Sequence, residues 1–577
     1  MSLANYITRA SDIDWQALRT PRAYSVMTAG AVALLWLIAV RARYEFLFQI
    51  PVQGADVTTS FAVMAARTWW IEGAWHSWFA TPYSPLSVET PTYASRMLYQ
   101  SFPPGYIAPI YLVASLLGRE PDVPMVNWIN FTSFGLLTLA VSFTAYHIAR
   151  LNRLSLNISA TIAVIVAIPI LFSPGMNYFF SQIYCTTTHV LPHLSVFLLL
   201  EAVFLRAQSG QQRRLILIGQ TAVIFWALMV DWLAYTVFAT WFALRLAGGR
   251  FLFVPQWSRN EIVALVCVPL AAFGLYLTWR LGAPGSMANT SGVGTSLYEL
   301  AWKALYRMNL TDASPVSGFG SIFLQIHKAF FVRYALPTLT AGALLLCLVL
   351  ILSSWSRLGP DERRLNWATG SIALLALVPF YAHLLLLYQH TAIHQWAISR
   401  IAFAYALIPF ALLPAALIRT MRLSNFQRLH APAARQRSIA FASGVIALAA
   451  IASALVGWQG SRKPNTLGWV SFPNYQMWHA IRVHTGYHDI VVSPVLQAPP
   501  IGIAVGLSNK LVYPATAWAE VDQRVATICE PFNVVIATPR GVAPGLSGMG
   551  TPDEVIEETY IVLQRFRDYR GARKGCA

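Results

Sequence analysis

The feature that most constrains this chain is a succession of long apolar runs between residues 24 and 458. A helix that spans a bilayer needs about 20 consecutive apolar residues. The whole chain is 56% hydrophobic and only 11% charged, whereas soluble domains carry about 25% charged residues. The sequence therefore predicts a polytopic α-helical membrane protein.

We expect about eleven transmembrane helices. They cover residues 24–40, 125–146, 156–172, 190–205, 215–230, 232–244, 262–279, 334–355, 365–388, 401–418 and 439–458. The run at 105–117 is too short to span, so we expect an interfacial helix there. Only Asp231 interrupts the run from 215 to 244. Arginines at both ends of that run favour a shallow hairpin with Asp231 at its outer tip.

The basic residues, which give the chain a net charge of +17, lie mostly in short loops. Such loops stay on the cytoplasmic side. With residues 1–23 inside, the arginine-rich loops fall inside, and the outer tips at 173–189, 231 and 389–399 carry no Lys or Arg. We therefore expect a multi-pass protein of the cytoplasmic (inner) membrane with a cytoplasmic N-terminus. This distribution points to membrane lipids, not nucleic acid, as the partner of the basic residues.

Two domains are expected. Residues 1–458 form the transmembrane domain, with outer loops at 41–124, which holds juxtamembrane helices, and at 281–333. Residues 459–577 are long enough for a small α/β domain on the periplasmic side. Within it, 489–493 and 533–537 have the pattern of short buried strands, and 551–569 has that of a helix with Thr551 as N-cap and acids in its first turns.

The first outer loop carries the most specific motifs. In chain order they are Asp56, Ala66-Arg67, Glu72-Gly73, Pro103-Pro104-Gly105-Tyr106 and Gly118. Together they resemble the first outer loop of the GT-C superfamily of membrane glycosyltransferases, which includes protein O-mannosyltransferases, the aminoarabinose transferase acting on lipid A and mycobacterial arabinofuranosyltransferases. Members often carry a second acid beside the first and a His before Pro-Pro. This chain has Val57 and Phe102 there, which argues against a metal-dependent version.

The resemblance implies a GT-C fold and a hexosyl- or pentosyltransferase. The donor would be a sugar on decaprenyl or undecaprenyl phosphate, and the acceptor a hydroxyl of an envelope glycan or lipid at the periplasmic face. The active site would then lie on the periplasmic side. We expect a monomer and assign no metal ligands and no certain cofactor, although a divalent cation is compatible with the pattern.

Asp56 is the candidate general base. A hydroxyl that attacks an anomeric carbon needs a base aligned on it, and a carboxylate at the edge of a dry cavity can serve. The alternative is a helix N-cap, because a helical pattern follows Asp56 and Asp is a favoured cap. Glu72 and Glu89 are the other acids of this stretch, and solvated loop charges are the simpler interpretation of both.

The leaving lipid phosphate requires arginine, lysine or protonated histidine at the outer interface. His390 and His394 are four residues apart and would share one helical face, and Arg400 stands where the next span enters. The alternative is a snorkelling arginine and two surface histidines. Lys303, Arg307 and Arg333 are further candidates for the donor phosphate.

Five residues are candidates for sugar or acceptor binding: Glu89, Gln182, His189, Asp231 and Tyr106. Polar residues at the ends of spans are often harmless, but an acid at the tip of a short hairpin is costly unless it faces a cavity or a partner. Structural pairing of Asp231 is the alternative.

Three other functions stay open from the sequence. A polysaccharide polymerase or ligase would use a polyprenyl-diphosphate donor and depend on arginine and histidine in a late outer loop. A transporter or flippase would move a lipid-linked sugar, although no internal repeat is obvious. A purely structural scaffold does not explain why Asp56 and the Pro-Pro-Gly-Tyr motif occur in the family's order.

Overall fold

The computed structural model covers the chain of 577 residues and describes most of residues 20–423 and parts of the C-terminal region. The described residues are 20–48, 56–81, 98–251, 258–283, 286–311, 324–325, 327–328, 331, 336–354, 359–423, 480–481, 483–486, 489–492, 515, 517–525, 532–543 and 545–567.

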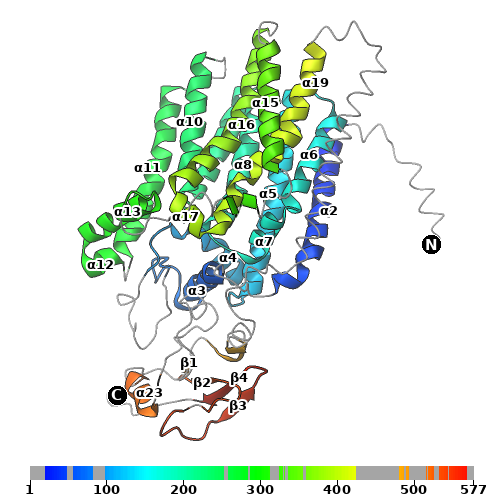
Figure 1. Cartoon of the computed structure of the whole chain (residues 1–577). Coiled ribbons are helices and arrows are strands. Elements are labelled where there is room, and N and C mark those ends of the chain that lie inside the picture. The colour runs from blue at the N-terminus through cyan, green and yellow to red at the C-terminus, as the bar shows by residue number, and fades with distance from the viewer. Residues whose placement is uncertain are drawn as a thin grey trace, which may run out of the picture.

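Long apolar helices form a bundle that makes up most of the described structure (Figure 1). In the first half of the chain the helices are α2 (Pro21–Leu47), α3 (Asp56–Glu72), the 3₁₀ helix η3 (Pro104–Tyr106), α4 (Ala108–Leu117), α5 (Val123–Leu151), α6 (Leu156–Leu171), α7 (Pro174–Gln182), α8 (Thr186–Arg206) and α9 (Gly210–Leu228). In the second half they are α10 (Leu233–Phe251), α11 (Arg259–Gly282), α12 (Met287–Ser291), α13 (Val293–Arg307), α15 (Leu336–Ser354), α16 (Pro360–Leu386), α17 (Tyr388–Ile393), η6 (Gln395–Ile401), α18 (Ala402–Leu407), the π-helical turn η7 (Ile408–Leu412) and α19 (Leu413–Leu423).

Among the described residues, six helices are long and apolar enough to cross a membrane. The bent pair α6 and α7, whose axes meet at 71°, raises this number to seven if it forms one span. Each of the first ten expected spans corresponds to a helix or a run of helical turns, whereas 439–458 lies outside the described residues. The polytopic helical fold is confirmed, and the number eleven stays a prediction.

The hairpin expected around Asp231 is present. Helix α9 ends at Leu228 and α10 begins at Leu233, so Asp231 lies in the break between two 19-residue helices. The Asp231 carboxylate accepts a hydrogen bond from the Leu233 backbone nitrogen at 2.8 Å. The acid therefore closes the turn as well as lying buried within it.

Helices α3, α4, α12, α13 and α17 gather at one end of the bundle, the end nearest the C-terminal sheet (Figure 1). The interfacial run expected at 105–117 is helical, as η3 followed by α4, and α4 ends on Gly118 at φ 58°. That left-handed conformation is the reason for glycine at this cap. Arg67 forms an ion pair with Glu120, which joins α3 to the segment after α4.

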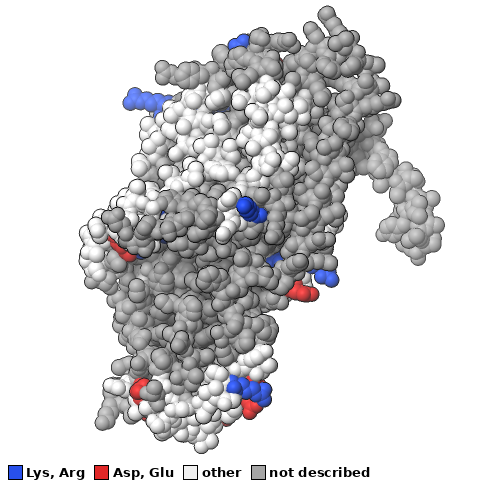
Figure 2. All heavy atoms as spheres, viewed as in Figure 1, with Lys and Arg blue, Asp and Glu red and all other residues white. Residues whose placement is uncertain are grey.

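The visible described surface of the bundle is almost free of charged side chains (Figure 2). Exposed leucines and valines cover helices such as α11 and α15 instead, among them Leu270 and Leu345 at 64% exposure each. Apolar side chains that face outward in this number suit contact with lipid acyl chains.

A small mixed sheet lies in the C-terminal region. Its strands are β1 (Ile490–Val492), β2 (Val534–Pro539), β3 (Glu554–Glu557) and β4 (Ile561–Phe566), in the order β1-β2-β4-β3, and α23 (Trp518–Val525) lies between β1 and β2 in the chain. Strand β1 is parallel to β2, and the other two pairings are antiparallel. The two expected strands are confirmed.

The helix expected at 551–569 is wrong, because this stretch forms β3 and β4. Ile561 and Leu563 are fully buried and alternate with less buried residues, which is the period of a strand. Glu554, expected in the first turn of a helix, instead forms ion pairs with Arg565 and Arg567, both at 2.7 Å. These pairs across the two strands replace the attraction of acids to a helix N-terminus that suggested the helix.

Candidate functional site

The centre of the candidate site is the guanidinium of Arg400, which is fully buried in η6. It donates hydrogen bonds to His383 Nδ1 at 2.8 Å and to Thr187 Oγ1 at 2.7 Å. Its Nη2 lies 3.5 Å from Asp231 Oδ2. Arg400 therefore does not snorkel to the surface. It joins three parts of the bundle that are far apart in the chain.

Asp231 is the acidic partner, and it is also fully buried. Besides the contact with Arg400, its Oδ2 accepts a hydrogen bond from Thr186 Oγ1 at 2.7 Å. Isolated buried charges are very costly, and an opposite charge with further hydrogen bonds offsets that cost. The paired arrangement explains how an acid is tolerated at the tip of the α9–α10 hairpin.

Both partners lie at the N-terminus of α8, whose first residues are Thr186 and Thr187. The free N–H groups at a helix N-terminus favour negative charge. Cys185 caps the helix, and its backbone nitrogen donates to Thr188 Oγ1 at 3.1 Å. The helix N-terminus and Arg400 thus present positive potential to the same small volume, and Asp231 neutralises only part of it.

His390 and His394 lie beside this cluster with ring centroids 4.3 Å apart. His390 is 8% exposed, so the interpretation as two surface histidines does not hold. Burial, followed by Arg307 and Arg400, lowers the pKa of His394 to about 4. Burial, His394 and Arg307 also hold the pKa of His390 well below its ordinary value. Both imidazoles are therefore neutral at pH 7, and the positive charge of the site comes from the arginines.

Arg307 reaches the same region from the end of α13. Its Cζ lies 5.1 Å from the ring centroid of Phe102, a distance typical of a cation–π contact. The Phe102 ring in turn packs edge-on against His390 at 6.2 Å. Phe102, which stands where the GT-C pattern often has His, therefore links the Pro-Pro-Gly-Tyr turn to the arginine and histidine cluster.

The turn itself is held against the hairpin at Gly105. Its backbone nitrogen donates to the Met229 carbonyl at 3.2 Å. A Cβ at this position would come within 2.4 Å of the same oxygen, so only glycine fits. Met229 is two residues before Asp231, and this contact places the motif next to the buried acid.

Tyr184 connects the remaining described candidates. Its hydroxyl donates to the Tyr106 carbonyl and lies 3.3 Å from His189 Nδ1. Its backbone nitrogen donates to Thr59 Oγ1 at 2.9 Å, which fixes α3 against the entry of α8. Tyr106 and His189 are therefore brought together.

Asp56 is the first residue of α3, three positions before Thr59, and its side chain lies outside the described part of the structure. Three residues correspond to a rise of about 4.5 Å along a helix. The backbone of Asp56 is thus within about one helical turn of the Thr59 contact. Its role as base or as N-cap stays a prediction.

Four other candidates have different outcomes. Lys303 pairs with Glu299 at 2.6 Å, on the same helix as Arg307. Gln182 is the last residue of α7, with its side chain outside the described residues, and Glu89 and Arg333 lie outside them altogether.

Sequence reasoning missed Thr186, Thr187 and His383. His383 lies inside an apolar run, and nothing in the sequence near it indicates its contact with Arg400. The three consecutive threonines before a span were a usable signal, since hydroxyls at a helix N-terminus often accept or donate hydrogen bonds there.

In the part of the chain that the structure describes, no three His, Cys, Asp or Glu side chains come close enough together to hold a metal ion. Asp56 and Glu89 are outside that comparison.

Several polar atoms of the site are buried without a hydrogen-bond partner among the described residues. They are Arg400 Nε, His383 Nε2, His390 Nδ1 and His189 Nε2. Buried polar groups are nearly always satisfied, by protein, water or ligand. Of these atoms, Arg400 Nε and His383 Nε2 are donors beside a positively charged cluster, and such donors suit an anionic ligand with several acceptor oxygens, such as a phosphate.

No protein-family model matches this sequence, and no curated protein matches it. Solved structures do resemble it. The apo oligosaccharyltransferase of Archaeoglobus fulgidus aligns with a TM-score of 0.50 and 11% identity over 89% of this chain and 69% of that chain. ArnT from Cupriavidus metallidurans, solved bound to undecaprenyl phosphate, aligns with a TM-score of 0.49 and 12% identity over 94% of this chain and 97% of that one. The likeness to the oligosaccharyltransferase shows that this chain has the GT-C-like fold.

Proposed function

We propose that this protein is an integral membrane glycosyltransferase that transfers a sugar from a polyprenyl-phosphate donor to an acceptor hydroxyl at the outer face of the membrane. The observation that carries the proposal is the buried Arg400–Asp231 pair at the N-terminus of α8. The GT-C-like fold, shared with an oligosaccharyltransferase, supports it. So does the position of the Pro-Pro-Gly-Tyr turn against the same hairpin.

In the proposed reaction the acceptor oxygen attacks the anomeric carbon while Asp56 removes the hydroxyl proton. The bond from the anomeric carbon to the phosphate oxygen breaks, and its electron pair leaves with the polyprenyl phosphate. Arg400 and Arg307 stabilise the negative charge on the leaving phosphate. The neutral His390 and His394 add N–H donors. A single essential acid favours one-step inversion at the anomeric carbon.

Asp56→Asn is the first test, in a deletion strain complemented at matched membrane levels. The variant keeps the size of the side chain but removes the base, so we expect loss of one glycan residue and accumulation of its polyprenyl-phosphate donor. General-base catalysis typically contributes about 10²- to 10⁴-fold, and we expect a rate loss in that range. Glu45→Gln, which removes an exposed acid at the end of α2, is the matched control and should retain activity.

Two outcomes would contradict the proposal. A wild-type glycan profile for Asp56→Asn together with lost activity for Arg400→Ala would favour a ligase that uses a diphosphate-linked donor. Undiminished movement of a lipid-linked sugar across liposomes by Asp56→Asn, with no transfer by the wild type, would favour a flippase.

A further inference from the structure

A pocket lies at the opposite end of the bundle from the candidate active site. It has a volume of about 470 Å³ and lies where α5 and α8 end and α9 and α16 begin. Helix α8 alone separates the two sites by about 30 Å, because its 21 residues rise about 1.5 Å each. The pocket therefore takes no part in the chemistry around Arg400.

The charge of this pocket is strongly positive. Four arginines line it and only one acid, Asp361: the arginines are Arg153, Arg206, Arg213 and Arg364. Arg153 also pairs with Glu362 at 3.4 Å, across from α5 to α16. The excess of positive charge favours an anion, and the guanidinium groups suit phosphate oxygens.

Apart from Gln208, the other lining residues are apolar, among them Phe204, Leu205 and Leu365. A free inorganic anion needs no such surface, whereas the glycerol and upper acyl carbons of a phospholipid do. Basic pockets between transmembrane helices on the cytoplasmic side are a recurrent site for lipid headgroups. The positive-inside distribution of arginines places this end of the bundle on that side.

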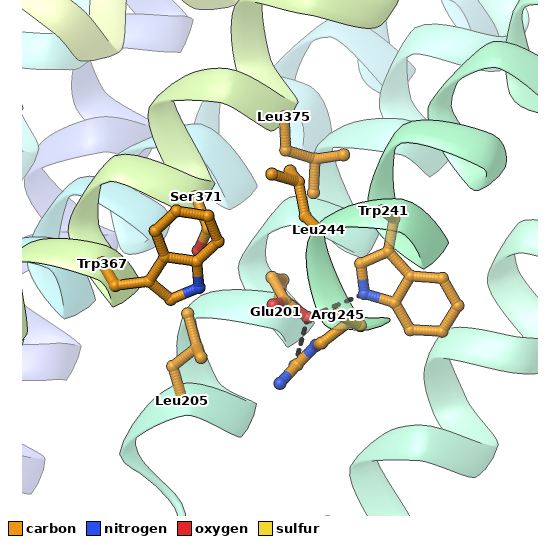
Figure 3. A pocket seen from close by; sticks show the side chains of 8 residues that line it. All are labelled: Glu201, Leu205, Trp241, Leu244, Arg245, Trp367, Ser371 and Leu375. Carbon is orange, nitrogen blue, oxygen red and sulfur yellow. Dashed lines mark hydrogen bonds and ion pairs between the residues drawn. The ribbon is translucent and has the colours of Figure 1, made fainter. Parts of the chain in front are cut away.

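Leu205 also lines a smaller neighbouring pocket, whose charged residues are Glu201 and Arg245 (Figure 3). Glu201 Oε2 accepts hydrogen bonds from Arg245 Nη2 at 2.6 Å and from Trp241 Nε1 at 3.0 Å. Arg245 is 6% exposed, yet its Nε and Nη1 have no hydrogen-bond partner among the described residues. Arg213 lies close enough to Arg245 for their charges to repel each other. An anion in the pocket would relieve that repulsion.

The backbone conformation of Arg153 also supports a role for its side chain in the pocket. Arg153 lies two residues after the end of α5 with φ 58°, a conformation that glycine adopts at much lower cost. The turn is closed by the hydrogen bond from Leu154 N to the Ala149 carbonyl at 3.1 Å. An arginine in a glycine position keeps a guanidinium at the pocket at the expense of backbone strain.

We propose that this pocket binds the phosphate-bearing headgroup of an anionic phospholipid from the inner leaflet. The arginines hold the phosphate, and the apolar part of the pocket holds the glycerol end of the lipid. The proposal is independent of the transferase reaction.

The test uses the full-length protein in detergent and native mass spectrometry to count bound lipid. The probes are phosphatidylglycerol, phosphatidylcholine at the same mole fraction, and inorganic phosphate as competitor. We compare Arg213→Gln/Arg364→Gln with the matched control Arg214→Gln/Arg363→Gln, which removes the same charge from neighbouring positions that do not line the pocket. Each lining arginine is expected to contribute about fivefold to binding.

The expected result is preferential retention of phosphatidylglycerol, about 25-fold weaker in the pocket double variant and less than threefold weaker in the control. Thermal unfolding of both variants checks that they fold equally well. Equal losses in the two variants, or equal retention of phosphatidylcholine, would overturn the proposal. Complete displacement by inorganic phosphate at concentrations similar to those of the lipid would also overturn it, by showing a site for free phosphate.

Discussion

Arg400 and Asp231 are each fully buried, so removing one leaves a charge without its partner. Breaking a buried ion pair from one side typically costs about 3–5 kcal/mol. We expect Arg400→Gln and Asp231→Asn each to lower the unfolding temperature markedly, and the double variant to be less destabilised than the sum of the two. Thermal unfolding in detergent of the wild type, the two single variants and the double variant measures this coupling. Strict additivity would mean that the two charges do not interact.

Arg307 and Lys303 stand on the same helix but differ in their partners. Lys303 is already paired with Glu299, whereas the charge of Arg307 acts on the two buried histidines. We expect Arg307→Gln to raise the KM for the lipid-linked donor by about tenfold, the size of about 1.4 kcal/mol of lost binding, and to lower kcat as well, because negative charge grows on the phosphate as it leaves. Lys303→Gln should raise the same KM by no more than about threefold. Equal increases in KM for the two variants would show that the donor phosphate does not bind Arg307 more strongly than Lys303.

His394 makes stability depend on pH in a defined window. Its pKa is lowered from 6.5 to about 4, chiefly by burial. Between these values the unfolded chain binds a proton that the folded chain does not, so the free energy of unfolding rises with pH from about 4 to 6.5. We expect the unfolding temperature to rise across this window, and less steeply in His394→Asn than in the wild type or in the exposed-site control His76→Asn. Parallel curves for all three proteins would contradict this.

At this scale the sequence predicted the types of side chain but not their neighbours. Arg400 and His390 were selected because a leaving lipid phosphate requires such side chains at the outer interface, and Asp231 because an acid at a hairpin tip is costly. The structure brings the three into one cluster. The contact of Arg400 with Thr187 joins residues 213 positions apart. No local pattern carries that information, since it depends on how α8 packs against η6.

At the scale of elements, the Pro-Pro-Gly-Tyr turn gives a sharp prediction. A Cβ at Gly105 would meet the Met229 carbonyl at 2.4 Å, and neither backbone can move without disturbing the hairpin that carries Asp231. Overpacking of this kind typically costs about 1–3 kcal/mol. We expect Gly105→Ala to lower both the unfolding temperature and transferase activity.

Gly30→Ala is the matched control, because the space around Gly30 on α2 is open within 4 Å. Alanine is also the better helix former, so this variant should be as stable as the wild type or more so. Equal stability of the two variants would show that the turn does not press against Met229.

Elements were predictable where one periodicity dominated. The apolar spans and the α9–α10 break followed from run length and a single acid, and β1 and β2 from short buried runs. The helix predicted for 551–569 was wrong because the acids of this stretch satisfy two patterns, a helix N-terminus and cross-strand pairing with Arg565 and Arg567. The neighbouring strand decides between them, and it is not visible in the local sequence.

For the whole molecule, the placement of the two ends of the bundle decides where chemistry takes place. The end with the candidate site holds α13, whose Tyr298 is 71% exposed, and the other end holds the start of α9 with exposed Gln211. The positive-inside rule predicts that the first end faces the periplasm and the second the cytoplasm. In a background without native cysteines, we expect a membrane-impermeant maleimide to label Tyr298→Cys in intact spheroplasts and Gln211→Cys only after permeabilisation. The reverse pattern would move the site to the cytoplasmic face, where nucleotide sugars would replace lipid-linked sugars as the available donors.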